Sequence, residues 1–214
     1  MSGKYSKIEW QETMNGVTID CSLDIAIHSA DSNVILLTVP GVDGSVDGFE
    51  NKYVTIAESI QKQHGAAVVR IANPFITSHH WESNVRQALA YINEHASEIC
   101  GYENFEIRII AHSAGAAILG QIAWEYPEIS RILLVNPAIA LNTEGFTHGL
   151  SQYSGNATIL VGTDDPSYGT VTSIVHSGIL DDTQLVEITG ADHHFSEPHF
   201  QVFLESPTKY LFEI

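Results

Sequence analysis

Apolar residues change their spacing several times along this chain, and each spacing predicts a different element. The segments Ile8–Thr13 and Val17–His28 are predicted strands, joined by Asn15-Gly16, a pair that tight β-hairpin turns prefer. In the second segment every second residue from Val17 to Ile27 is apolar or cysteine, which predicts a strand with one buried face. We therefore expect the chain to begin with an antiparallel hairpin.

After the hairpin, continuous apolar runs alternate with segments of helical spacing. Continuous runs predict strands buried on both faces, and stripes repeating every three to four residues predict helices. The predicted strands are Val34–Val39, Ala66–Ala72, Phe105–Ala111, Arg131–Asn136, Thr158–Gly162 and Thr183–Thr189. The predicted helices lie around Tyr53–Ile60, Val85–Ile99, Ser113–Tyr126 and Tyr168–Val175, and a last one begins near Ser196–Pro198. Residues 138–156, which contain three glycines, are predicted to be irregular.

This alternation predicts an α/β fold with helices on both faces of one sheet. Including the antiparallel hairpin, the sheet should have eight strands and be mostly parallel. A chain of 214 residues can fill one core well, and we expect residues 1–214 to form a single domain.

Composition and charge restrict the partners and the compartment more than the activity. The formal net charge of −17 opposes binding to nucleic acid or to an anionic membrane, but it says little about a small substrate. The N-terminus lacks the apolar run of a signal peptide, and no run approaches the roughly 20 residues of a membrane span. Cys21 and Cys100 have no metal-type or redox-type spacing, which favours two thiols in a reducing cytoplasm. A processed or unconventionally exported protein remains an alternative.

Chemically suggestive residues follow four of the predicted parallel strands, at the edge where α/β sheets bind ligands. In chain order they are Pro40-Gly41-Val42, Ala111-His112-Ser113-Ala114-Gly115, Asp164-Asp165 and His193-His194. Ser113 lies between small residues at a strand-to-helix turn, where an α/β enzyme would place a nucleophile. Taken alone, it could equally be a helix cap.

The order of these residues and their positions after strands resemble the α/β-hydrolase superfamily. The resemblance rests on Ala111-His112-Ser113-Ala114-Gly115, Gly162-Thr163-Asp164-Asp165-Pro166 and Gly190-Ala191-Asp192-His193, and its strand-and-helix pattern covers nearly the whole chain. It implies the three-layer α/β-hydrolase fold and a serine esterase-like activity. The chain departs from many members in having Pro40 in place of histidine and Ala111 in place of glycine. It also lacks a cap domain, since only about 20 residues separate the strands that end at Asn136 and begin at Thr158.

The resemblance implies a catalytic triad that cleaves a carboxylic ester through an acyl-enzyme. Ser113 would be the nucleophile, His193 the general base and then acid, and Asp165 the carboxylate that orients the imidazole. Asp164 stays open as the acid, because Asp165 precedes Pro166 and could instead cap the next helix.

Further expectations concern the surroundings of the triad. The oxyanion would be bound by the backbone N–H groups of Val42 and Ala114. The residues that could line the substrate pocket are His79, His80, Phe146 and Tyr153. His112 would support packing at the turn without transferring a proton.

No metal or cofactor is expected. Asp192, His193 and His194 are adjacent, and no spaced partner completes a ligand set. Side chains and water can carry every step of ester hydrolysis. The expected partner is therefore a small-molecule acyl substrate, and an open site fits an accessible ester.

Three alternatives accompany this interpretation. A thioesterase or a peptidase would use the same triad, and a hydrolase-like protein could bind a ligand or partner without turnover. A dehydrogenase is disfavoured, because the first strand-to-helix loop, Pro40–Ser45, lacks the spaced glycines that hold a pyrophosphate.

Overall fold

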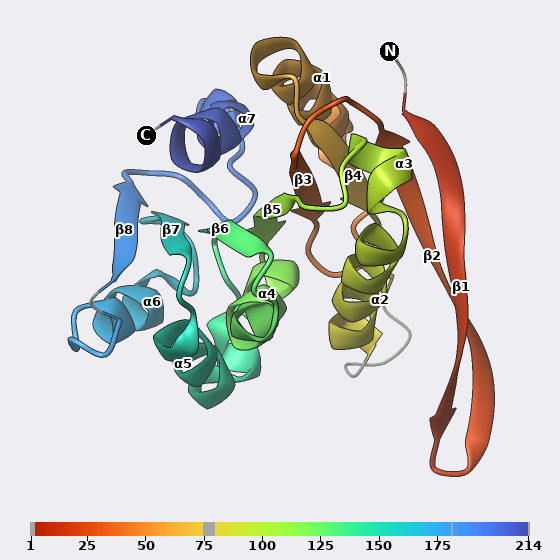
Figure 1. The fold of residues 1–214 in the computed structure, drawn as a ribbon. Helices are drawn as coiled ribbons and strands as arrows, with labels where there is room; N and C mark the ends of the chain where they lie inside the picture. Colours follow the sequence, from red (N-terminus) through yellow and green to blue (C-terminus); the bar gives the residue numbers. More distant parts are fainter. Residues whose placement is uncertain (1–2, 75–79, 181, 214) are drawn as a thin grey trace.

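An eight-stranded sheet forms the centre of the molecule (Figure 1). The structure, a computed structural model, describes residues 3–74, 80–180 and 182–213, and of Met14 and His80 only the backbone. The strands are β1 (Lys4–Met14), β2 (Val17–His28), β3 (Val34–Val39), β4 (Ala67–Ile71), β5 (Glu106–His112), β6 (Ile129–Val135), β7 (Asn156–Gly162) and β8 (Thr183–Ile188). Their order is β1-β2-β4-β3-β5-β6-β7-β8. The pairs β1–β2 and β2–β4 are antiparallel and the others are parallel, which confirms the predicted sheet.

Helices cover both faces of this sheet (Figure 1). One face carries α1 (Lys52–His64) and α7 (Phe200–Pro207). The other carries α2 (His80–Glu94), α3 (Ala96–Cys100), α4 (Ala114–Ile122), α5 (Thr143–Gln152) and α6 (Tyr168–Val175). Short helical turns are η1 (Phe49–Asn51), η2 (Ala123–Glu125), η3 (Ile139–Leu141) and η4 (Thr208–Phe212). Among the described residues, no helix has both the length and the apolar character needed to cross a membrane.

The continuous apolar sequences of the parallel strands follow from the helices on both faces of the sheet. Ile35 and Leu37 of β3 pack into the core under α2 and α4, whereas Leu36 packs into the core under α1 and α7. Successive side chains of a strand point to opposite faces, so a strand covered on both sides must be apolar throughout.

The N-terminal hairpin differs from the prediction in its burial. The alternation along β2 predicts one buried face throughout, but Val17 is 61% exposed and burial begins at Cys21. Only Ile25–His28 pair with β4, so the half of the hairpin nearer the turn extends beyond the sheet (Figure 1).

Residues 138–156 contain a helix, so the predicted irregular segment is wrong. The side-chain oxygen of Asn142 accepts a hydrogen bond from the N–H of Gly145 (3.0 Å) and caps α5. A Cβ at Gly149 would lie 2.3 Å from the carbonyl oxygen of Gly120 in α4. Glycine at this position lets α4 and α5 approach closely, a packing requirement that resembles a loop in sequence.

Two helix boundaries also differ from the predicted ones. The apolar stripe from Val85 to Ile99 is divided between α2, which ends at Glu94, and α3. The last helix begins at Phe200, a few residues later than expected.

Candidate functional site

Ser113 alone forms the turn between β5 and α4. Its backbone has φ 56° and ψ −120°, and a positive φ is uncommon for any residue with a side chain. The N–H of Ser113 donates to the carbonyl of Val135 (3.0 Å), and its carbonyl accepts from the N–H groups of Ala117 (3.0 Å) and Ala138 (3.1 Å). These hydrogen bonds hold the strained turn that lifts the hydroxyl above the end of the sheet.

Small neighbours are required around this turn. A Cβ at Gly115 would lie 2.4 Å from the carbonyl oxygen of Pro40. A Cβ at Gly41 would lie 3.0 Å from the Cβ of Ser113 and 3.4 Å from its Oγ. The loop after β3 therefore lies close against the serine turn, and glycine at both positions avoids these contacts.

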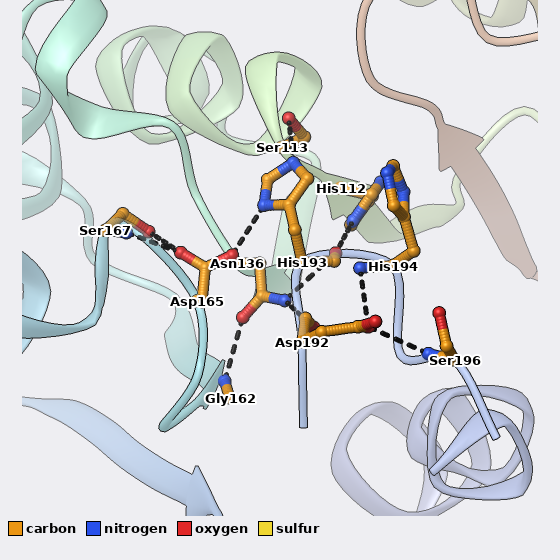
Figure 2. A network of polar contacts seen from close by, with 10 residues as sticks. All are labelled: His112, Ser113, Asn136, Gly162, Asp165, Ser167, Asp192, His193, His194 and Ser196. Carbon is orange, nitrogen blue, oxygen red and sulfur yellow. Dashed lines mark hydrogen bonds and ion pairs between the residues drawn. The ribbon is translucent and has the colours of Figure 1, made fainter. Parts of the chain in front are cut away.

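The structure brings Ser113, His193 and Asp165 into one hydrogen-bonded series (Figure 2). The Oγ of Ser113 lies 2.9 Å from Nε2 of His193, and Nδ1 of His193 lies 2.5 Å from Oδ2 of Asp165. Because the carboxylate accepts the Nδ1–H, the neutral imidazole keeps Nε2 free to accept the hydroxyl proton. Three residues from three different strand ends thus form an arrangement suited to proton transfer.

The carboxylate of Asp165 is buried but remains ionised. Burial alone would raise the pKa of Asp165, but hydrogen bonds from His193 and Ser167 outweigh it and hold the pKa below its ordinary value. The second oxygen, Oδ1, accepts from the N–H of Ser167 (2.7 Å) and from its hydroxyl. Asp165 therefore contacts the histidine with one oxygen and ties the turn before α6 with the other.

Asp164, the alternative acid, points elsewhere. It is exposed, and its Oδ1 accepts a hydrogen bond from Oγ1 of Thr163 (3.3 Å). The alternative role considered for Asp165, capping the next helix, is wrong, because the N-cap of α6 is Ser167, to which Asp165 is hydrogen-bonded.

Asn136 joins the segments that carry the acid and the base, and it is not among the residues predicted from the sequence. Its Nδ2 donates to the carbonyls of Asp192 and His193 (3.0 Å each), and its Oδ1 accepts from the N–H of Gly162 (2.9 Å) (Figure 2). Asn136 itself has a positive φ of 44°. A signal was available, because Asn136 is the last residue of a predicted strand and so lies at the same sheet edge as the four motifs.

His112 is hydrogen-bonded to the backbone of His193, the expected base. Its Nε2 donates to the carbonyl of His193 (2.8 Å) (Figure 2). Burial lowers the pKa of His112 to about 3, and the nearby ammonium of Lys52 acts in the same direction. The ring of His112 is therefore neutral. It positions the backbone of His193, in addition to the packing role expected for it.

Asp192 shapes the loop that follows β8. Its Oδ1 accepts from the N–H groups of His194 (3.1 Å) and Ser196 (2.9 Å), so this carboxylate closes the turn around the base. Within the described residues, no group of three or more histidine, cysteine, aspartate or glutamate side chains is arranged to hold a metal ion.

The two expected oxyanion donors lie beside the serine. Ala114 is the first residue of α4, so its N–H has no acceptor within the helix. Val42 lines the same cavity as Ser113. Their role as oxyanion donors stays a prediction.

Two cavities meet at His193. The first has a volume of about 310 Å³ and is lined by Pro40, Gly41, Val42, Gly44, Gly48, Phe49, Lys52, Tyr53, His112, Ser113, His193 and His194. The second has a volume of about 270 Å³ and is lined by Ala138, Ile139, Ala140, Asp165, Pro166, Ser167, Thr170 and His193. Of these lining residues only His193 is shared, so a ligand centred on Ser113 could extend to either side of the imidazole.

Two of the expected pocket residues, Phe146 and Tyr153, are not among those that line these cavities. Phe146 is 1% exposed and packs on Gly120 in the core, because the unpredicted helix α5 turns it toward α4. The hydroxyl of Tyr153 donates to the carbonyl of Ile129 (3.1 Å), away from the site. The prediction for these two residues is therefore wrong. His79 lies outside the described residues, as does the side chain of His80.

Solved structures resemble this chain over almost its whole length. No protein-family model and no curated protein matches its sequence. Est1E from Butyrivibrio proteoclasticus has a TM-score of 0.69 at 15% identity, covering 94% of this chain and 96% of that one. Dienelactone hydrolase from Anabaena variabilis has 0.68 at 16% identity, with 97% of each chain covered. The esterase Pf2001 of Pyrococcus furiosus has 0.69 at 14% identity, covering 97% of this chain and 93% of that one. At these identities the likeness concerns the fold.

Proposed function

We propose, from the α/β-hydrolase fold that this chain adopts, that the protein is a serine hydrolase that cleaves a carboxylic ester through an acyl-enzyme on Ser113. Since one fold serves many activities, the proposal rests on the site. The observation that carries it is the hydrogen-bonded series from the Oγ of Ser113 through His193 to Asp165, at 2.9 and 2.5 Å.

Acylation uses this series in one direction. Nε2 of His193 takes the proton of Ser113 as Oγ forms a bond to the ester carbonyl carbon. The imidazolium then gives that proton to the alcohol oxygen as the carbon–oxygen bond to the alcohol breaks. Asp165 holds the ring in the required tautomer and stabilises its positive charge throughout.

Deacylation repeats the same steps with water. His193 takes a proton from the attacking water and returns it to Oγ when the acyl group leaves as a carboxylic acid. In both halves the tetrahedral oxyanion would accept hydrogen bonds from the N–H groups of Val42 and Ala114, which support it without reorganising.

The open surroundings favour a small accessible ester. Between β6 and β7 the described chain forms only η3 and α5, and α5 packs on α4. The cavities on either side of His193 give separate space to the acyl and alcohol parts of a substrate whose carbonyl lies at Ser113.

A fluorophosphonate probe tests the proposal directly, because it forms a covalent bond only with an activated serine. We expect the wild type to be labelled at Ser113, and Ser113→Ala to lose the label. Ser154→Ala, which removes an exposed serine elsewhere, should keep it. A folded wild type that stays unlabelled and hydrolyses no p-nitrophenyl acetate would refute the proposed serine hydrolase activity and favour a non-catalytic binding protein.

A further inference from the structure

A buried lysine lines the cavity that contains Ser113. Lys52, the first residue of α1, is 6% exposed. Among the described residues, no acidic one lines this cavity, although the chain has a formal net charge of −17. Of the described residues that do line it, Lys52 is the one basic residue apart from three histidines. The positive charge is thus isolated at the site in an otherwise strongly acidic protein.

Within the described residues, no carboxylate forms an ion pair with Lys52. Burial lowers the pKa of Lys52 to about 8, so the ammonium form still predominates at pH 7. The position of Lys52 at the start of α1 also disfavours the ammonium form, since the N-terminal end of a helix carries partial positive charge. Two aromatic rings make favourable contacts with the amine: Nζ lies 4.0 Å from the ring centroid of Phe203 and 5.3 Å from that of Tyr53.

The loop that presents Lys52 is held firmly. Arg70, which is 1% exposed, donates to the carboxylate of Asp47 (2.6 Å) and to the carbonyl of Val46 (3.0 Å). The N–H of Tyr53 donates to the carbonyl of Asp47 (3.0 Å). The start of α1 is therefore fixed relative to the sheet, and the cavity wall does not have to be ordered when a ligand arrives.

We propose that Lys52 binds a carboxylate group of the substrate, so that the protein prefers esters that carry one free carboxylate, such as half-esters of dicarboxylic acids. A buried ammonium without an ion-pair partner gains from an anion that enters the cavity beside it. A single cation matches a single negative charge, whereas a phosphate dianion would keep an uncompensated charge. This proposal rests on the proposed hydrolase function, because the carboxylate is placed relative to an ester at Ser113.

A pair of esters tests this preference in the unaltered protein. The p-nitrophenyl half-ester of adipic acid and its methyl-capped diester differ in the free carboxylate. We expect kcat/KM to be at least about 10-fold higher for the half-ester. An equal or higher kcat/KM for the capped diester overturns the proposal without any variant.

Substitution of the lysine identifies the group responsible. Lys52→Met keeps the length and the apolar stem, and we expect it to lower the ratio of the two kcat/KM values by about 10- to 100-fold. Lys62→Met removes an exposed charge from the same helix and should leave the ratio unchanged. An unchanged ratio in a folded Lys52→Met variant overturns the proposal.

Binding without turnover separates this proposal from the hydrolase function. In Ser113→Ala, calorimetric titration with monomethyl adipate should give a dissociation constant about 10- to 100-fold weaker when Lys52→Met is added. Lysine-dependent binding supports the carboxylate site even if Ser113 proves unreactive. Lysine-independent binding, or tighter binding of monoethyl phosphate than of monomethyl adipate, overturns it.

Discussion

Replacing Asp165 with asparagine changes one atom of the site and should stop catalysis through the tautomer of His193. In the wild type, Oδ1 accepts from the N–H of Ser167 (2.7 Å) and Oδ2 accepts from Nδ1 of His193 (2.5 Å). Asparagine has only one oxygen to offer. The backbone N–H of Ser167 can only donate, so the amide oxygen must stay there and the NH₂ group must face the imidazole.

The magnitude follows from that orientation. A donor facing Nδ1 makes this nitrogen the acceptor and moves the ring proton to Nε2, which can then no longer accept the proton of Ser113. We expect kcat to fall by about 10⁴-fold, equivalent to about 5.5 kcal/mol in the activation free energy, the size measured for the same change in a serine protease. The ground-state affinity for substrate should change little, because the side chain of Asp165 is fully buried behind the histidine.

Hydrolysis of p-nitrophenyl acetate and the rate of fluorophosphonate labelling measure this loss. Asp164→Asn is the matched control, since the exposed Asp164 contacts Thr163 and makes no contact with the imidazole. It should keep kcat within about threefold of the wild type. A folded Asp165→Asn variant that retains more than a tenth of the wild-type kcat, or a larger loss in Asp164→Asn, would refute the reasoning.

Other perturbations follow from the same structure. Asn136→Ala removes the hydrogen bonds between the acid and base loops, and kcat/KM for the same ester should fall about 10- to 100-fold; unchanged kinetics would show that these loops hold their geometry alone. Gly115→Ala places a Cβ 2.4 Å from the carbonyl oxygen of Pro40 and should lower the free energy of unfolding by about 1–3 kcal/mol in urea titrations, whereas Gly169→Ala, with open space around it, should not destabilise. The pKa of His112 is about 3 in the folded protein and about 6.5 in the unfolded chain, so protonation of the unfolded chain destabilises the fold below about pH 6.5. The free energy of unfolding should fall from this source by about 1.4 kcal/mol per pH unit toward pH 3. His112→Gln should remove this part of the dependence of the unfolding free energy on pH, and equal slopes in the two proteins would contradict it.

The sequence predicted the sheet and the triad candidates for the same reason. Ser113, Asp165 and His193 each follow a strand, and parallel strands bring their carboxyl ends together whatever the loop details. The choice between Asp164 and Asp165 needed the structure, because adjacent residues share every local signal and differ only in the direction of their side chains.

The features that were missed depend on contacts between distant segments. Gly149 resembles a loop residue until α4 is seen against it. Asn136 resembles the polar end of a strand, and its hydrogen-bond partners lie in β7 and in the loop after β8. Lys52 at a helix start resembles an exposed residue, and only the packing of Phe203 and the cavity wall shows that it is buried.

The half of the β1–β2 hairpin that leaves the sheet allows the chain to be lengthened there. The turn at Asn15-Gly16 is open, with no other atoms within 4 Å of a Cβ placed on Gly16. Pairing of β2 with β4 begins only at Ile25, and the preceding residues 17–24 of β2 have their strand register with β1. An epitope or a fluorescent peptide inserted at this turn would therefore interrupt a two-stranded ribbon and leave every parallel pairing that positions Ser113, Asp165 and His193 in place.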